Sequence, residues 1–403
     1  MSPSIVVLAA KRTAVGTFGG TLKGWNANDL GAEAAKAALA QAGLVGDELA
    51  FVDQVIVGNV LQTSADAIYC ARHVGLKAGL PITVPALTVN RLCGSGFQAI
   101  VSGAEQILLG DANVVLVGGT ENMSMAPHVM RGGRDGFAYG RAPAMEDMLA
   151  AALIDSYVTN GSGSGTPMGI TAENLAVKYG ISREDCDNFA LLSQARTAAA
   201  KAAGAFKDEI VPLTVSTKKG DIVFAEDEHP RPATTAEQLA KLKPVFKKDG
   251  VVTAGNASGI NDAGCMLVLA REDWAKEHGK TPIARLRGWG TAAVDPSIMG
   301  IGPVPAIKLA LARTGLSLAD VDLVEVNEAF ASQYLAVEKE LGLDREKTNL
   351  DGGAIAIGHP LAASGARITA HLCYALAARN KKIAVGSACI GGGQGMAVVL
   401  ERI

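Results

Sequence analysis

Two cysteines each stand at the front of a glycine-rich turn, and the residues around them are suited to acyl chemistry. Cys93 lies in NRLCGSGFQAI and Cys389 lies in SACIGGGQGM. Between them in the sequence are His359, in GAIAIGHPLAASG, and Asn327, in VEVNEAF. A thiol that attacks a carbonyl needs a group that takes its proton and donors that stabilise the oxyanion. These four residues therefore predict an enzyme that transfers an acyl group through a cysteine.

Cys93 can be compared with the other cysteines of the chain. A free cysteine is most often a small buried hydrophobe, and this interpretation fits Cys70, Cys186, Cys265 and Cys373. Cys93 differs because Gly94 and Gly96 follow it and apolar residues at helical spacing then continue to Gly110. We therefore expect Cys93 at the start of a helix, where the helix dipole favours a thiolate.

The other three positions each have a structural alternative. His359 could be an ordinary loop histidine, and Cys389 could mark a tight turn before a last strand. The glycines at 391–393 could instead bind an oxyanion, whereas a P-loop is excluded because no Lys-Ser or Lys-Thr follows them. Asn327 could cap the helix predicted for FASQYLAVEKEL.

An internal repeat indicates how the chain brings these residues together. Residues 30–44 match 302–316 at an offset of 272, and three residues then drop out. The resulting offset of 269 still holds where Ser95-Gly96 aligns with Ser364-Gly365. The period is far too long for a solenoid, so we infer two copies of one αβ unit in a pseudo-symmetric pair. In that arrangement the Cys93 turn and the turn after His359 can face each other across one pocket.

The middle of the chain, residues 124–250, has no counterpart in the second half. It contains two loop-rich stretches, 131–143 and 160–167, and a helix predicted over 182–204 with Ser182 as its N-cap. Long insertions on a rigid scaffold usually carry substrate contacts. We therefore expect this segment to cover the site.

Composition excludes several classes of function. The chain has 403 residues, a formal net charge of −3 and 19% charged residues, which gives no general attraction to nucleic acid or to an anionic membrane. The six cysteines form no CxxC pair and fit neither a disulfide framework nor a zinc site. The apolar run near the N-terminus is short and lacks a preceding basic region. These features predict a soluble cytoplasmic protein, with an organelle as the alternative.

Several separate blocks of the sequence, in order, resemble the thiolase family of acyl-CoA:acetyl-CoA acyltransferases. They are RTAVGTFGG, NRLCGSGFQAI, GGTENMS, TAENLA, GNASGIND, MGIGPVPA, NEAFA, GGAIAIGHP and CIGGGQG. The resemblance runs essentially from end to end. It implies an α/β protein with the five-layered αβαβα fold of two pseudo-equivalent halves and an inserted loop domain. The expected division is 1–123 completed by 251–272, then 124–250, then 273–403.

The resemblance also implies a role for each residue of the site. Cys93 would be the nucleophile that holds the acyl group as a thioester. His359 would activate it and, with a water held by Asn327, stabilise the thioester oxyanion. Cys389 would be the second acid and base, and the N–H groups of Cys93 and Gly391 would form the second oxyanion hole.

Coenzyme A would be a substrate, with no cofactor and no metal. The residues at positions that match the family's CoA contacts are Ser258, Arg231, Phe246 and Met168. The partners implied are 3-ketoacyl-CoA and CoA, without nucleic acid or membrane, and the chain is expected to form a homodimer or a homotetramer. The stretch 131–143 is expected to be an assembly loop or a lid.

Two departures from the family pattern concern the site. Ala362 stands where the family usually has glycine, and a methyl group there would strain the turn if the position needs a positive φ. Pro167 precedes Met168 where acetoacetyl-CoA thiolases of biosynthesis usually carry histidine. We therefore favour a broad-range 3-ketoacyl-CoA thiolase of fatty acid β-oxidation, with an acetoacetyl-CoA-specific thiolase as the alternative. Other condensing enzymes of this fold and a non-catalytic acyl-CoA or lipid carrier are less favoured, because all four catalytic positions are filled.

Overall fold

The computed structural model describes residues 3–140, 143–159 and 165–403, and its centre is an eleven-stranded mixed sheet. Along the main path of the sheet, four strands form one copy of the repeated unit and five form the other copy. In spatial order these are β15 (Leu323–Val326), β16 (Ile383–Ile390), β17 (Gln394–Glu401), β14 (Ala284–Ala293), β1 (Ile5–Thr13), β13 (Asn261–Arg271), β5 (Val114–Asn122), β3 (Gln54–Gly58) and β4 (Ala86–Val89). The short strands β10 (Ile210–Val211) and β2 (Gly16–Thr17) pair with β1 and β13.

This strand order reads as two copies of one unit joined back to back. In one copy, β15 and β16 are parallel, and β16 and β17 are antiparallel. In the other copy, β3 and β5 are likewise parallel, and β5 and β13 are antiparallel. The halves meet where β1 and β14 pair over three residues on each strand. The internal repeat predicted from the sequence thus corresponds to a repeat of strand order and direction.

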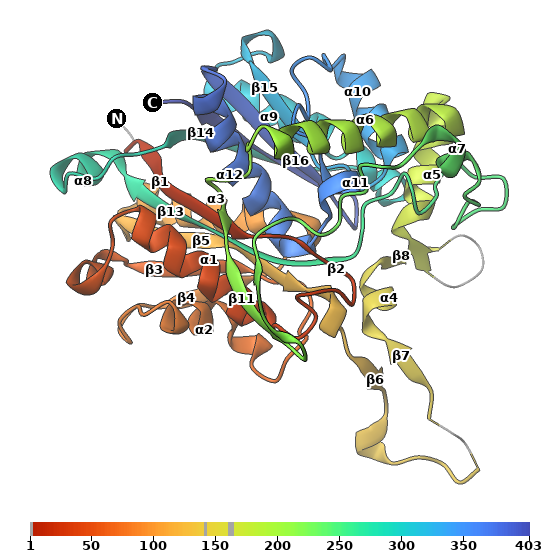
Figure 1. Cartoon of the computed structure of the whole chain (residues 1–403), viewed down its shortest axis with the longest axis horizontal. Coiled ribbons are helices and arrows are strands. Elements are labelled where there is room, and N and C mark those ends of the chain that lie inside the picture. The colour runs from red at the N-terminus through yellow and green to blue at the C-terminus, as the bar shows by residue number, and fades with distance from the viewer. Residues whose placement is uncertain (1–2, 141–142, 160–164) are drawn as a thin grey trace.

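Helices cover both outer faces and fill the space between the halves (Figure 1). Between the halves are α3 (Ser95–Leu109) and α12 (Leu361–Ala378); the outer layers are α1 (Ala27–Gln41) with α2 (Cys70–Lys77), and α9 (Pro303–Thr314) with α10 (Ala331–Leu341). Three separate hydrophobic clusters fill the interfaces of these layers. The predicted five-layered αβαβα fold is confirmed.

The two middle helices approach closely at the glycines that the repeat aligns. A Cβ atom added at Gly96 would lie 2.6 Å from the carbonyl oxygen of Ala362, and one added at Gly365 would lie 2.6 Å from the backbone nitrogen of Phe97. Larger residues at either position would push the helices apart. This crossing places the turn before α3 next to the turn before α12, and those turns carry Cys93 and His359.

The insertion interrupts the first copy between β5 and β13. Its elements are β6 (His128–Met130), β7 (Met145–Asp147), α4 (Met148–Ala152), β8 (Ile154–Thr159), β9 (Gly165–Pro167), α5 (Met168–Tyr179), α6 (Arg183–Ala202), β11 (Leu213–Thr217), β12 (Gly220–Phe224) and α7 (Ala236–Ala240), besides β10. Elsewhere the chain forms α8 (Glu272–Glu277) and α11 (Ala354–Ile357). Ser182 caps α6 in a full capping box, as predicted. Residues 160–164 of the predicted loop 160–167 lie outside the described residues.

The β6–β7 hairpin extends away from the body as a narrow arm (Figure 1). Among the residues that the structure describes, no helix is long and apolar enough to cross a membrane. Within the same residues, no group of three or more His, Cys, Asp or Glu side chains is arranged to hold a metal ion.

Candidate active site

Cys93 lies in a single 3-10 turn, Leu92–Gly94, that leads directly into α3. The residue before it, Leu92, has a φ of 47°, a left-handed conformation that leucine rarely adopts. Asn90 and Ser95 hold this turn, because the Asn90 Oδ1 accepts a hydrogen bond from the Leu92 nitrogen and the Ser95 hydroxyl donates to the Leu92 carbonyl. Backbone strain that neighbouring bonds stabilise is common at catalytic residues.

Burial raises the pKa of the Cys93 thiol to about 11. The backbone N–H groups of Gly391 and of Cys93 itself lower this pKa, but they do not outweigh the loss of solvent. The thiol is therefore protonated at neutral pH. The start of α3 and these N–H groups favour the thiolate, as expected for a helix N-terminus, but desolvation of the charged sulfur opposes them and is the larger effect.

His359 occupies the turn before α12 and is bonded on three sides. Its backbone nitrogen donates to the Asn261 Oδ1 at 2.9 Å, its Nδ1 lies 2.6 Å from the Ser364 Oγ, and its Nε2 lies 3.5 Å from the Asn327 Nδ2. Burial, followed by the charge of Arg367, lowers its pKa to about 4. The imidazole is neutral at physiological pH, which is the state that a base requires.

Asn327 directly follows β15, and its backbone nitrogen donates to the Ser387 carbonyl at 2.8 Å. Its Oδ1 is buried and has no hydrogen-bond partner among the described residues, a position that a water could satisfy. The alternative role as a helix cap is wrong, because α10 begins at Ala331 and Phe330 is at its N-cap position. The side chain of Asn327 thus faces His359 rather than the start of a helix.

Cys389 lies near the end of β16, and Gly391 is the first residue of the turn that follows this strand. Cys389 is completely buried in a small cluster with Met299 and Ala329. Burial raises its pKa, and the nearby Cys93 raises it further. The two sulfurs are therefore electrostatic neighbours, and Gly391 supplies an N–H to the first of them.

A cavity of about 390 Å³ opens onto Cys93 and His359. Its wall is mainly apolar, and the insertion contributes much of it, including the predicted CoA contacts Met168 and Phe246. The predicted contact Ser258 also lines the cavity. Cys389, Asn327 and Gly391 are outside its lining, behind the first layer of side chains.

Arg231, the fourth predicted CoA contact, does not line this cavity. Its guanidinium donates to the carbonyl oxygens of Glu228, His229 and Pro230 in its own loop, and its backbone nitrogen donates to Gln194. The sequence gives the residue type at this position but not the direction of so long a side chain.

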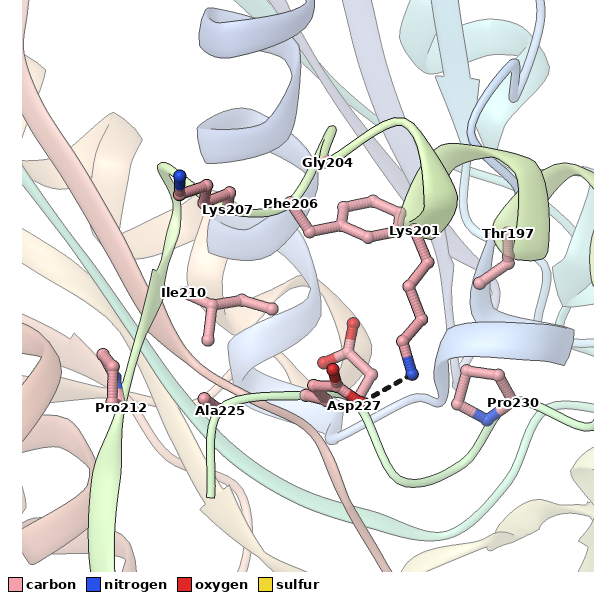
Figure 2. Close-up of a pocket in the computed structure, with 11 residues that line it drawn as sticks. Thr197, Lys201, Gly204, Phe206, Lys207, Ile210, Pro212, Ala225, Asp227 and Pro230 are labelled. Atoms are coloured by element: carbon pink, nitrogen blue, oxygen red, sulfur yellow. Dashed lines mark ion pairs between the residues drawn. The ribbon is translucent and has the colours of Figure 1, made fainter. Parts of the chain in front are cut away.

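A second cavity of about 260 Å³ lies beside the end of α6 and contains none of the four predicted catalytic side chains (Figure 2). Lys201 crosses it to pair with Glu226 at 2.7 Å, and Lys207 points away from it. Asp227, at its base, pairs with the buried Arg12 at 2.6 Å. We assign the chemistry to the first cavity for these reasons.

Three residues that sequence reasoning did not assign also support the site. They are Leu92, Ser364 and Glu121, whose buried carboxylate accepts hydrogen bonds from the backbone of Leu61 and Ala362. Burial raises the pKa of Glu121 to about 7. The alignment of Ser95 with Ser364 in the internal repeat was a signal that could have identified Ser364. The roles of Leu92 and Glu121 depend on contacts between segments far apart in the sequence, so no local pattern indicates them.

Ala362 creates no strain at its position. It lies in the first turn of α12 and is not among the residues with positive φ. The expectation that its methyl group would tilt the turn if φ were positive therefore does not apply, and alanine is a favourable residue in a helix.

In a comparison with known protein families, two family models match consecutive parts of the chain. Residues 5–273 match the model "Thiolase, N-terminal domain" and residues 280–402 match "Thiolase, C-terminal domain". The chain is 59% identical to the human protein named 3-ketoacyl-CoA thiolase, mitochondrial, over 98% of each chain. It is 47% identical to the Acetyl-CoA acetyltransferase of Thiocystis violacea over 100% of each. A crystal structure of the human mitochondrial 3-ketoacyl-CoA thiolase in complex with CoA superposes with a TM-score of 0.94 and 57% identity, covering 100% of this chain and 98% of that one.

The comparison corrects the predicted compartment. The human relative is named as a mitochondrial protein, so the prediction of a cytoplasmic protein is wrong. Free thiols and a small net charge do not distinguish one reducing compartment from another. The compartment is set by targeting signals that receptors recognise, and these signals are not a property of the fold.

Proposed function

This chain belongs to the thiolase family, and we propose that it is an acyltransferase that cleaves 3-ketoacyl-CoA with CoA, yielding acetyl-CoA and an acyl-CoA two carbons shorter. The observation that carries the proposal is that Cys93 and His359 line one apolar cavity, while Cys389 is buried behind that lining and close enough to Cys93 for this neighbour to raise its pKa. A thiol, a neutral imidazole and a second thiol are the groups that this reversible chemistry needs.

The first half of the proposed reaction forms an acyl-enzyme. The Cys93 thiol gives its proton to the His359 Nε2 while the sulfur bonds to the C3 carbonyl carbon of the substrate. The bond between C2 and C3 then breaks, and its electron pair leaves with acetyl-CoA as an enolate. Cys389 protonates C2, so acetyl-CoA departs and the acyl group stays on Cys93 as a thioester.

The second half restores the enzyme. The Cys389 thiolate takes the proton of the CoA thiol, and the CoA sulfur attacks the thioester carbonyl. Cys93 leaves and recovers its proton from the His359 imidazolium. The two thiols can act in turn because Cys389 is fully buried while Cys93 is only partly so.

Two sets of donors stabilise the oxyanions in this scheme. One consists of the backbone N–H groups of Cys93 and Gly391, which already point at the Cys93 sulfur. The other consists of His359 and a water held by the unpartnered Oδ1 of Asn327. Donors fixed before the reaction are worth several kcal/mol, about 3 per donor in known cases.

The apolar wall with Met168, Phe246 and Ser258 fits the pantetheine arm of CoA. Phe246 follows Lys241 and Lys243 in an exposed segment, and Lys247 and Lys248 come after it. These lysines provide a local positive field for the phosphates on a protein whose net charge is −3. Arg231 would reach a phosphate after it releases its own loop carbonyls.

The length of the acyl chain separates the two candidate activities. A broad-range enzyme is supported by Pro167 before Met168 and by the apolar lining of the cavity. The acetoacetyl-CoA-specific alternative is supported by the similarity to the protein of Thiocystis violacea. Thiolysis rates with 3-ketoacyl-CoA of about four, eight and sixteen carbons test the two directly: comparable rates favour the first, and a rate confined to the shortest chain favours the second.

A Cys389→Ala variant separates the thiolase from a condensing enzyme that uses one cysteine. Loss of thiolysis is expected because the enolate then lacks its proton donor, whereas Cys93 should still accept an acetyl group from acetyl-CoA, since the CoA thiolate can leave without forming an enolate. Unimpaired turnover would favour the other condensing enzymes. Binding of CoA without any acyl exchange in the unmodified protein would favour a non-catalytic carrier.

The chain is further proposed to assemble as a homodimer or as a tetramer of two such dimers. β4 is an exposed edge strand with Leu87 on it, and an edge of that kind invites pairing with another copy. The β6–β7 arm exposes Phe137 and Tyr139, which fits a role in assembly. The domain boundaries 1–123 with 251–272, 124–250 and 273–403 stay a proposal. Light scattering of the wild-type protein and of a Tyr139→Ser variant tests the assembly.

A further inference from the structure

We propose that Ser364 is a positioning residue of the acyl transfer, which accepts the Nδ1 proton of His359 and so keeps the lone pair of Nε2 free for the Cys93 proton. The inference rests on the proposed function, because it assigns a role within the same reaction. It concerns the choice between the two neutral forms of the imidazole, which differ in the nitrogen that carries the hydrogen.

The Ser364 hydroxyl is placed to act as an acceptor. Its Oγ lies 2.6 Å from the His359 Nδ1, and the two residues are only 2% and 5% exposed. The Oγ also lies 3.3 Å from the Pro360 carbonyl oxygen, to which its hydrogen can donate. A hydroxyl that donates to Pro360 presents a lone pair to Nδ1, and that nitrogen then carries the hydrogen.

The contact on the Nε2 side of the His359 ring favours the same neutral form, with the hydrogen on Nδ1. The polar atom near Nε2 is the Asn327 Nδ2, at 3.5 Å. An amide nitrogen is a donor and cannot accept, so Nε2 must present its lone pair. Two contacts from different segments, one with Ser364 of α12 and one with Asn327 just after β15, thus favour the form of His359 that can act as a base.

The backbone and the charges around the ring leave the choice between the two neutral forms to Ser364 and Asn327. The nitrogens of Ala363 and Ser364 both donate to the Pro360 carbonyl, so the turn is rigid. The charged groups near it are Arg367 on α12, paired with Glu325 of β15, and Glu121 of β5. Because burial, and after it the charge of Arg367, lowers the pKa of His359, the ring stays neutral and its hydrogen must go to one nitrogen or the other.

Without the serine hydroxyl, the Nδ1 hydrogen would have no partner in a buried place. The hydrogen would then move to Nε2, where it blocks transfer from Cys93, or it would stay at the cost of an unmade hydrogen bond. We expect the Ser364→Ala variant to acetylate Cys93 from acetyl-CoA about ten- to a hundredfold more slowly than the wild type.

The experiment compares two reactions of the same sulfur. The first is acetylation of Cys93 by acetyl-CoA, which needs the base; the second is alkylation of Cys93 by iodoacetamide at about pH 9, where hydroxide can form the thiolate. Ser364→Ala should slow the first and leave the second within about twofold of the wild type. Ser364→Thr, which keeps the hydroxyl, should recover most of the acetylation.

Thr369→Val is the matched control. Thr369 is also a buried hydroxyl residue on α12, and its Oγ donates to the Gly365 carbonyl at 2.8 Å rather than to the imidazole. It should leave both reactions unchanged. A Ser364→Ala variant with wild-type acetylation overturns the proposal, as does one in which acetylation and alkylation fall together, or a Ser364→Thr variant that recovers nothing. A wild-type protein that takes up no acetyl group refutes the proposed function itself.

Discussion

The reactivity of Cys93 toward an alkylating agent should rise steadily with pH and reach no plateau near neutrality. With a pKa of about 11, the thiol is ionised in roughly one molecule in ten thousand at pH 7 and in one in a hundred at pH 9. Since only the thiolate reacts, the rate should increase about tenfold per pH unit between pH 7 and 10. Cys93 is also the least buried of the six cysteines, so it should react first.

The assay measures second-order rates of iodoacetamide alkylation at Cys93 by peptide mass spectrometry. CoA serves as the free-thiol control, and its rate should level off above a pKa of about 8.5. A plateau for Cys93 between pH 6 and 8 would mean that the sulfur and His359 form a thiolate–imidazolium pair at rest. That outcome would refute the conclusion that burial outweighs the helix dipole and the N–H of Gly391.

Three further predictions concern the backbone of the site and the stability of the fold. Gly391→Ala should lower kcat with little effect on the melting temperature, because its Cβ would lie 3.1 Å from Leu92 and 3.3 Å from Met168. Gly392→Ala is the matched control, because φ at Gly392 is 80° and an added Cβ would meet no neighbouring atom. This variant should lose about 1 kcal/mol of unfolding free energy and keep its kcat. Equal losses of kcat in the two variants would contradict the assignment of Gly391 to the oxyanion hole. Burial lowers the pKa of His371, but the carboxylates of Glu209 and Asp351 outweigh burial and raise this pKa to about 10. The charged His371 stabilises the fold fully below its unfolded pKa of about 6.5, and this stabilisation is lost as pH rises toward 10. The difference in unfolding free energy between the wild type and a His371→Gln variant, measured in urea, should therefore shrink over that range. A constant difference would count against the ion pairs of His371 with Glu209 and Asp351. Ala362→Gly should destabilise the protein by about 1 kcal/mol without raising kcat, and a gain in kcat would restore the strained-turn interpretation.

The sequence predicted the features that depend on local pattern and on the repeat. The aligned Ser95-Gly96 and Ser364-Gly365 pairs correspond to the crossing of α3 and α12, and Ser182 caps its helix as the residue type suggested. It did not predict the features set by tertiary contacts. The raised pKa of Cys93 comes from burial, and the outward loop contacts of Arg231 come from carbonyls that happen to lie within its reach.

Asn327 and Leu92 show the same division. The residue type of Asn327 fits a helix cap and a water ligand equally well, and the position of the first turn of α10 excludes the cap. The left-handed backbone of Leu92 is not expected for leucine, and the hydrogen bonds of Asn90 and Ser95 that hold it become evident when the turn is seen folded. Local propensity gives no signal for strain that surrounding contacts impose.

The most direct measurement is the mass spectrum of the protein after incubation with acetyl-CoA. We expect one acetyl group per chain, located on the peptide with Cys93, removed by added CoA and absent from a Cys93→Ser variant. An unmodified protein, or an acetyl group on another cysteine with Cys93 free, would contradict the account.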